Sequence, residues 1–393
     1  MASQELFTYQ DMVERVLDLY GEYLRTNVRN LRIARMAVLN AYEDMPAHNR
    51  WTYYQRRGQV TTEASYDTGT ISYDHAGGSN ERQLTLTGGT WPTNAAFGQV
   101  TIGNVNYKID SRVSATILTL SPNSNPGADV AAATSYTWWR SVYPLPVNFS
   151  KMGKLTDLST AYDPDYESPN TFVERLRGNY TPSRPNFFTL RNAGEYFGGL
   201  SIEFGPPPST ATTYDYSYEA RPRPIKRELY NTGTVDTTAS SATVTGTGTN
   251  FVADMVGAVL RLPPSGSANE PTPKQGGLSV DEPYDEQRII SAVASTTSLT
   301  LHEGVTNTLS TIKYTISDPL DIESGSMMTY LQSLAEFYAS RRYGASGKEV
   351  DATEARSKRK LIEAMVADSR IHDLGNIGRG RFGADLGDIA IHA

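Results

Sequence analysis

Two stretches of the chain repeat the same series of β-strand patterns in the same order. Residues 68–139 contain TGTI, QLTLTGGTWP and YKIDSRVSATILTL, and residues 232–317 contain TGTV, ATVTGTGTNF and RIISAVASTTSLTL. Threonine alternates with apolar residues between glycine-bounded turns, which is the pattern of short, half-buried strands. The sequence therefore predicts two homologous modules, each a small antiparallel β-barrel or sandwich of about five strands. Chance similarity between threonine-rich strands is the alternative.

Helical patterns flank the β-rich region at both ends of the sequence. Apolar residues recur at helical spacing over residues 9–24 and 28–45, and the same spacing returns after residue 320. A final helix is expected to carry one apolar face, made of Leu361, Ile362, Met365 and Val366. Because no helix can bury such a stripe alone, we expect the N- and C-terminal helices to pack together as one bundle.

A third β region with different turn residues lies between the two modules. Its segments GGLSIEFGP and TTYDYSYEARP have the alternation of two adjacent strands. The expected fold class is therefore α+β and multidomain. Its expected parts are a helical bundle (1–57 and 321–371), a first β module (58–140), a central antiparallel β region (141–228), a second β module (229–320) and an extended C-terminal arm (372–393).

Charge and composition exclude several classes of function. The chain has 393 residues, with 36 lysines and arginines against 43 acidic residues, a net charge of -7. This balance argues against a protein that coats nucleic acid. There is no cysteine, which excludes disulfides and thiolate metal sites. No apolar run approaches a membrane span, so neither a secretion signal nor a membrane anchor is expected.

Signals for catalysis are weak throughout the chain. The five histidines show no paired-ligand spacing, and GRGRFG at residues 378–383 does not lie between a strand and a helix, as a phosphate-binding loop would. Two acidic clusters lack the spacing of a calcium loop. These clusters are Asp163, Asp165 and Glu167, and Asp281, Glu282, Asp285 and Glu286. We expect no enzymatic activity, no catalytic residue, no bound metal and no cofactor.

The C-terminal helical region carries a local concentration of positive charge. The candidate subunit-contact residues are Arg341, Arg342, Arg356, Lys358, Arg359 and Lys360. Three interpretations remain open: a solvated helix face with internal pairs such as Glu354 with Lys358, docking to an acidic partner or neighbouring subunit, and contact with phosphates. Residues 372–393 are rich in glycine but contain regularly spaced apolar residues, which favours an arm that orders on a partner.

Three motifs follow the N-terminal helices in a fixed order. A tryptophan leads into the β region, an aromatic strand leads into a Tyr-x-Leu-Pro-x-Asn-Phe segment, and an apolar strand ending in proline leads into a tyrosine-rich strand. They are carried by Trp51; by Tyr143, Leu145, Pro146, Asn148 and Phe149; and by Ile202, Phe204, Pro206, Tyr214, Tyr216 and Tyr218. With the C-terminal helical hairpin, this order resembles head-to-tail adaptor (connector, neck) proteins of tailed bacteriophages over nearly the whole chain. The threonine-rich modules resemble small barrels inserted in some of these proteins.

The resemblance implies a structural protein of the phage virion, located at the neck and assembled in the host cytoplasm. It implies a homo-oligomeric ring, usually of twelve subunits, that binds beneath the portal protein and carries tail, tail-tube or nozzle proteins. DNA would pass through the lumen without sequence-specific binding, and an acidic channel would let it slide. The resemblance also implies that the arm reaches the portal through Arg370, Leu374, Ile377, Arg379, Arg381 and Phe382.

Two other classes of function compete with the adaptor. A tail or baseplate protein could bind host-surface carbohydrate through its β modules, and this predicts that Trp91, Trp138 and Trp139 are exposed. A glycan-degrading tail enzyme could use the acidic loops, although no sequence motif supports it. Helices at both ends of the chain favour the adaptor over both.

Overall fold

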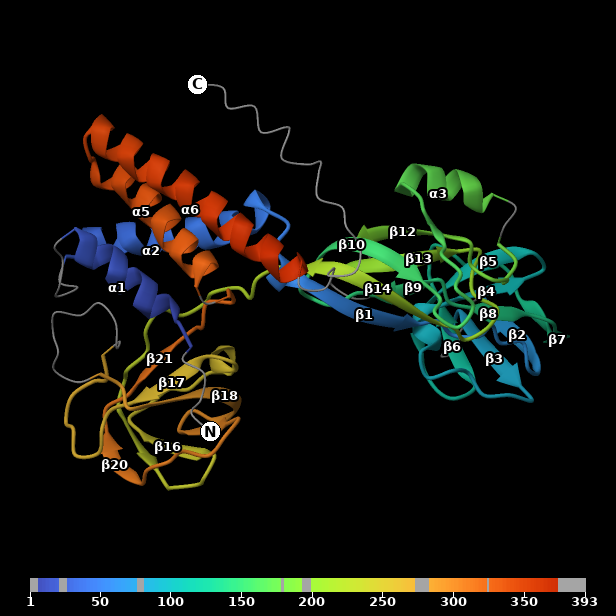
Figure 1. The fold of residues 1–393 in the computed structure, drawn as a ribbon. Coiled ribbons are helices and arrows are strands. Elements are labelled where there is room, and N and C mark those ends of the chain that lie inside the picture. The colour runs from blue at the N-terminus through green and yellow to red at the C-terminus, as the bar shows by residue number, and fades with distance from the viewer. Residues whose placement is uncertain are drawn as a thin grey trace. The chain divides into compact units, whose positions relative to one another are not determined.

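The computed structural model describes residues 6–20, 27–75, 81–177, 180–192, 199–272, 283–323 and 325–373. The fold is α+β, with helices and almost entirely antiparallel sheets (Figure 1). The chain divides into two compact units, residues 1–54 with 222–393 and residues 55–221. None of the helices in the described segments combines the length and apolarity needed to cross a membrane.

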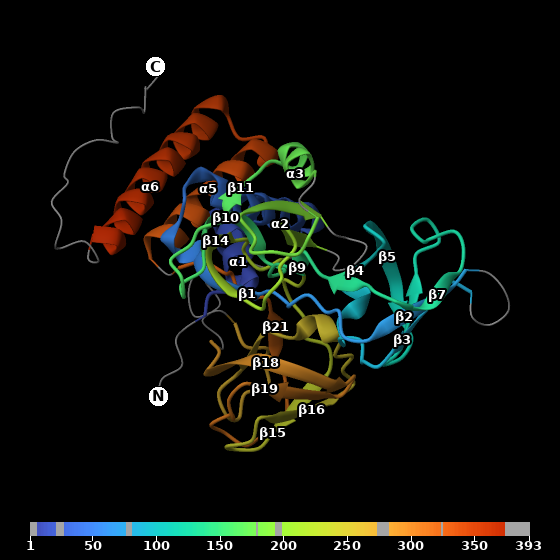
Figure 2. The ribbon, with the colours of Figure 1, turned by 90° about the vertical axis from the view of Figure 1, so that its right-hand side faces the viewer.

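Helices from both ends of the chain share one apolar core in the first unit. These helices are α1 (Tyr9–Leu19), α2 (Val28–Asp44), α5 (Ser326–Tyr343) and α6 (Gly347–Asp373). Helix α5 packs against α2, α6 and α1, and it lies beside α6 in Figures 1 and 2. Asn27 begins α2 because its side chain accepts from the amides of Arg29 and Asn30. Trp51 closes the core with its indole nitrogen bound to the Met45 carbonyl at 3.0 Å.

A buried ion pair joins α1 to strand β17 (Val259–Leu262) within this unit. Arg261 donates from both terminal nitrogens to the two carboxylate oxygens of Asp11, each at 2.7 Å, and only 2 % of its surface is exposed. Asp11 also accepts from the Thr8 amide at 2.7 Å and so completes the capping box of α1. The ring of Tyr284 lies 4.3 Å from the guanidinium. One carboxylate therefore both caps a helix and anchors a strand.

Two seven-stranded antiparallel sheets have the same order of equivalent strands. The first runs β7-β2-β3-β6-β5-β4-β8 and the second β20-β15-β16-β19-β18-β17-β21. The first comprises β2 (Thr70–Asp74), β3 (Gln83–Thr87), β4 (Gln99–Ile102), β5 (Val105–Arg112), β6 (Ile117–Leu120), β7 (Val130–Thr134) and β8 (Thr137–Trp139). The second comprises β15 (Thr234–Thr237), β16 (Thr243–Thr247), β17 (Val259–Leu262), β18 (Glu286–Ser295), β19 (Ser298–Leu301), β20 (Leu309–Ile312) and β21 (Thr315–Ser317).

Side-chain contacts repeat between the two sheets as well. The Thr90 amide donates to the Tyr66 hydroxyl at 3.0 Å, and the Asn250 amide donates to the Tyr230 hydroxyl at 2.6 Å. A second tyrosine, directly before β8 in one case and before β21 in the other, donates to the carbonyl that precedes the glycine of the TGT segment. These bonds run from Tyr136 to Thr68 at 2.9 Å and from Tyr314 to Thr232 at 2.6 Å.

The glycines of the two TGT segments, residues 68–70 and 232–234, lie where two backbone segments approach closely. Gly69 and Gly233 have φ values of +86° and +84°. A Cβ at Gly69 would lie 2.3 Å from the Thr87 carbonyl oxygen, and one at Gly233 would lie 2.4 Å from that of Thr247. Both the left-handed backbone and the missing space require glycine.

The central β region of the second unit consists of two smaller sheets around a shared core. The three-stranded sheet contains β1 (Gln55–Thr61), β14 (Thr213–Ala220) and β10 (Phe149–Thr156), in that order. The four-stranded sheet contains β11 (Asp165–Tyr166), β12 (Phe187–Asn192), β13 (Leu200–Gly205) and β9 (Val142–Pro144), with α3 (Pro169–Leu176) against β12. Short 3₁₀ turns occur at Met45–His48, Thr52–Tyr54, Ala95–Phe97 and Ala253–Met255.

Most of the apolar motif residues of the central region meet in one place. A single core cluster contains Tyr143, Leu145, Phe149, Ile202, Phe204, Tyr214, Tyr216 and Tyr218. In β14 the tyrosines face this core, whereas Ser217 is exposed on the other face. Because alternate residues of a strand face the same side, the tyrosines at every second position of β14 form one buried aromatic layer.

Two expectations from the sequence require correction. Each module sheet has seven strands rather than about five, because strands as short as Thr137–Trp139 carry too few residues for a periodic signal. On α6, Ile362 and Val366 are 60 % and 45 % exposed, so they do not belong to the buried face. That face is formed by Leu361, Ala364 and Met365, because α6 contacts the core along one narrow side.

The close approach at Gly69 leads to a stability prediction. Gly69→Ala is expected to lower the free energy of unfolding by about 2 kcal/mol or more, because the new methyl group adds a clash to the strain of a positive φ. Gly103→Ala is the matched control, since Gly103 has a φ of +57° but no atom within 4 Å of a Cβ. Urea unfolding of both variants would measure the difference, and equal losses would contradict the clash.

Candidate functional site

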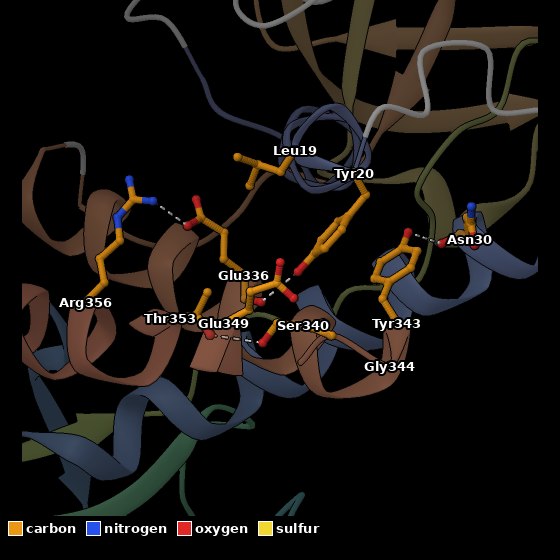
Figure 3. Close-up of a pocket in the computed structure, with 11 residues that line it drawn as sticks. Leu19, Tyr20, Asn30, Glu336, Ser340, Tyr343, Gly344, Glu349, Thr353 and Arg356 are labelled. Carbon is orange, nitrogen blue, oxygen red and sulfur yellow. Dashed lines mark hydrogen bonds and ion pairs between the residues drawn. The ribbon is translucent and has the colours of Figure 1, made fainter. Parts of the chain in front are cut away.

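A polar groove lies among the ends of α1, α2, α5 and α6 in the first unit (Figure 3). Its volume is about 540 Å³, and its principal lining residues are Tyr20, Glu336, Ser340, Tyr343, Glu349 and Arg356. The groove lies at the turn between α5 and α6, within the helical region where the sequence predicts subunit contacts.

Local sequence explains why the two helices meet here. Helix α5 ends because Gly344 adopts a left-handed backbone with φ of 76°. Glu349 then accepts from the amide and hydroxyl of Ser346 at 2.9 and 3.1 Å, which caps the start of α6. The hydroxyls of Ser340 and Thr353 join the two helices at 3.0 Å inside the groove.

A buried carboxylate forms one side of the groove. Glu336 is 3 % exposed, accepts from Gln332 at 3.1 Å and from Arg356 at 2.9 Å, and thereby links α5 to α6. Burial raises the pKa of Glu336, and the Arg356 guanidinium partly offsets this effect. The charge of Arg356 is therefore already balanced within the groove.

Two stacked tyrosines form the opposite side. The rings of Tyr20 and Tyr343 lie 4.0 Å apart, centroid to centroid. Tyr20 donates to the Glu336 carbonyl at 3.3 Å and Tyr343 donates to the Asn30 carbonyl at 3.0 Å, which fixes both rings. Burial raises the pKa of Tyr20 to about 12, and nearby groups including Glu349 add to the increase. Tyr20 is therefore a neutral donor at physiological pH.

The groove offers several kinds of group to a bound partner. It offers an aromatic side, hydroxyls and the carboxylate of Glu349, which no lysine or arginine of the described segments neutralises. Aromatic rings beside a carboxylate suit a cationic side chain from a partner. Elsewhere in the described segments, no three histidine or acidic side chains gather closely enough to hold a metal ion.

The six candidate subunit-contact residues lie together on the α5–α6 hairpin, and most of them have local partners. Arg356 pairs with Glu336, Lys358 with Glu354 at 2.8 Å, and Lys360 with Glu363 at 2.6 Å. Arg359 lies 3.9 Å from Glu363 and Arg341 lies over the Phe337 ring. Arg342 donates to the side-chain oxygen of Asn40 at 3.1 Å when the Asn40 amide is oriented so that its nitrogen donates to the Met36 carbonyl. Of this set only Arg356 lines the groove.

The candidate portal-binding residues fall largely outside the described part of the chain. This applies to Leu374, Ile377, Arg379, Arg381 and Phe382. Arg370 belongs to α6, but its side chain also lies outside the described residues.

The three tryptophans of the first module are buried. Trp91, Trp138 and Trp139 are 1 %, 1 % and 2 % exposed. The indole nitrogens of Trp138 and Trp139 donate to the Ala95 carbonyl at 3.1 Å and the Thr101 hydroxyl at 2.9 Å. Their rings are therefore not available to stack on a sugar.

The acidic loops are occupied by internal ion pairs. Asp163 pairs with Lys154 at 2.6 Å, and Glu167 pairs with Arg175 at 2.5 Å. Glu286 pairs with Arg288 at 2.5 Å and accepts from the Thr306 amide. Asp281 and Glu282 lie outside the described residues.

A scan against protein families finds none that matches this chain, and a search of curated proteins finds no match.

Sequence reasoning missed Tyr20, Glu336, Tyr343 and Glu349 as members of one site. The available signal was a glutamate in the middle of an otherwise apolar helical stripe, near Leu334 and Ala335. A charged residue in such a position is buried only when it is paired.

The raised pKa of Glu336 gives a pH-dependent prediction. Because the folded state holds this proton more tightly than the unfolded state, ionisation costs stability as the pH rises above the ordinary value of 4.5. Glu336→Gln cannot ionise and therefore does not lose stability in this way. The stability of the wild type relative to Glu336→Gln should therefore fall as the pH rises through the window above 4.5.

Urea unfolding at a series of pH values would measure this difference. Glu354→Gln is the control on the neighbouring helix, because Lys358 lowers the pKa of Glu354 and any change should have the opposite sign. A wild type that gains stability over Glu336→Gln with rising pH would contradict the account.

Proposed function

We propose that this chain is a structural, non-enzymatic head-to-tail adaptor of a tailed phage virion. It forms a ring of about twelve copies beneath the portal, joins the capsid vertex to the tail and lines the DNA channel. The ring is assembled in the host cytoplasm and becomes part of the virion neck. Its partners are further copies of itself, the portal protein and tail, tail-tube or nozzle proteins.

The observation that carries the proposal is that two of the three resemblance motifs meet in one core. Tyr143, Leu145 and Phe149 from one motif pack with Ile202, Phe204 and the three β14 tyrosines from the other. Motifs that are weak individually are thus parts of one folded region in the expected order. Trp51 lies in the core that the N- and C-terminal helices share, which supports a helical bundle built from both chain ends.

The two seven-stranded sheets are, in this proposal, homologous modules of one adaptor subunit. Their equivalent strand orders, their glycine pairs and their matching tyrosine hydrogen bonds support a common origin. Side-chain contacts that repeat at matching positions favour this origin over chance similarity of threonine-rich strands.

Charge is consistent with a channel for DNA. The net charge of -7 disfavours tight binding to phosphates, so DNA that passes a ring of such subunits is not retained by them. Burial of Trp91, Trp138 and Trp139 removes the main support for the alternative, a tail or baseplate protein that binds carbohydrate through these rings.

Capture by a portal ring tests the proposal. Native mass spectrometry of the full chain with a candidate portal should show about twelve copies bound per portal. A variant that ends at Asp373, the last residue of α6, should bind more weakly because it lacks the arm. A stable trimer that ignores the portal would overturn the adaptor and favour a tail-borne binding protein.

A further inference from the structure

We propose that Asp321 is a clamp that restricts how far the two units of the chain can turn relative to one another. The chain passes from the first unit to the second at Tyr54–Gln55 and returns at Arg221–Pro222. From within the first unit, Asp321 binds the segments at both of these passages. The inference goes beyond the proposed function and does not depend on it.

The outgoing segment, Thr52–Tyr54, is bound by two aspartates of the first unit. The Tyr53 hydroxyl donates to the Asp321 carboxylate at 2.9 Å, and the Tyr54 hydroxyl donates to the Asp321 carbonyl at 2.9 Å. The Thr52 amide donates to both carboxylate oxygens of the buried Asp368 on α6, at 3.0 and 3.1 Å. The chain is therefore held up to the last residue before it leaves the first unit.

The returning segment is held by the same carboxylate. The Arg223 amide donates to the other carboxylate oxygen of Asp321 at 3.2 Å. The buried Tyr42 of α2 joins these two residues again, because its hydroxyl donates to the Arg223 carbonyl at 2.9 Å and accepts from the Asp321 amide at 3.3 Å. The Arg223 guanidinium also donates to the Val256 carbonyl at 2.9 Å and to Asp318 at 3.2 Å. Both passages thus have a fixed end in the first unit.

Few backbone torsions stay free between these fixed ends and the second unit. Gln55 and Glu219 face each other at one end of β1 and β14, so the strand ladder holds both strands close to the passages. Tyr54 is bound to the clamp and directly precedes β1. The return leaves Arg221 and Pro222 between β14 and the clamp, and the proline ring fixes one φ angle. Without the clamp, further torsions in both connections would become free, and a hinge gains its range from such torsions.

The apolar cores of the molecule do not supply this restriction themselves. Each core cluster of the described segments draws its residues from a single unit. Units with separate cores are expected to move relative to one another by default. A clamp at the connections limits such motion without a shared core. A subunit whose units keep one orientation also loses less freedom when a partner binds both of them.

Distances between spin labels test the clamp, and the absence of cysteine from the chain allows labels at chosen positions. One labelled pair joins the units through the exposed positions Ala355→Cys and Val173→Cys. The other pair lies within the first unit, at Ala355→Cys and the exposed Glu303→Cys. In the full chain, Asp321→Ala should broaden the distance distribution of the first pair at least roughly twofold. Tyr53→Phe, which loses one tie, should broaden it less, and neither variant should change the second pair.

Tyr338→Phe is the matched control for Tyr53→Phe. The Tyr338 hydroxyl donates to Asp44 between α5 and α2, so this variant also loses a bond from a tyrosine to a carboxylate of the first unit. Because neither residue belongs to a connection between the units, the first distribution should stay as in the wild type. Circular dichroism would verify the fold of every variant, and Tyr53→Phe decides alone if Asp321→Ala does not fold.

The labelled pairs separate a clamp from a general structural role. Broadening that is confined to the pair joining the units supports the clamp. Distributions that stay unchanged in folded Asp321→Ala and Tyr53→Phe would overturn it. Broadening of both pairs would also overturn it, because the first unit itself has then loosened. Equal broadening in Tyr338→Phe and Tyr53→Phe has the same consequence, since the effect would not be specific to the connections.

Discussion

The buried pair between Asp11 and Arg261 is the constraint on which the first unit depends. A carboxylate and a guanidinium that are both almost fully withdrawn from water are tolerable only when each satisfies the other. Here the same carboxylate also caps α1, so the helix start and strand β17 share one polar anchor. Asp318 plays a comparable part nearby, since it accepts from the amides of Lys226 and Arg227. The helices and the second β module are consequently held as one unit, although residues 55–221 separate the parts of the chain that form it.

Apolar spacing along the sequence was sufficient to predict where the helices lie, because a helix is defined by contacts between residues close in sequence. The apolar spacing over residues 28–45 predicted α2, which runs from Val28 to Asp44. The prediction that Ile362 and Val366 belong to the buried face of α6 was wrong. Helical spacing predicts a stripe of apolar residues, but it does not predict how much of that stripe a neighbouring element covers. A long helix that rests on one side of a core leaves part of its stripe exposed.

Contacts between distant residues could not be predicted in this way. Asp11 and Arg261 are 250 positions apart, and neither stands in a motif that names the other. The groove brings Tyr20 together with Glu336 and Tyr343 from the opposite end of the chain, so no window of sequence contains the site. The central aromatic core was easier to foresee, because alternation along β14 already placed its tyrosines on one face.

The adaptor proposal gives each region a mechanical part. In this proposal the α5–α6 hairpin, which carries the six candidate subunit-contact residues, supplies the contact between subunits. The central β region supplies the rigid aromatic core in which the resemblance motifs meet. The two module sheets repeat one design with the same strand order, which suits a subunit that was enlarged by duplication. No catalytic constellation is needed for such a role.

The position of the chain in an intact particle tests the account most directly. Electron cryomicroscopy of virions that carry this protein should reveal its fold as a closed ring between the portal and the tail, with an open lumen wide enough for DNA. Density for the same fold on tail fibres or a baseplate, or its absence from the neck, would contradict the central claim.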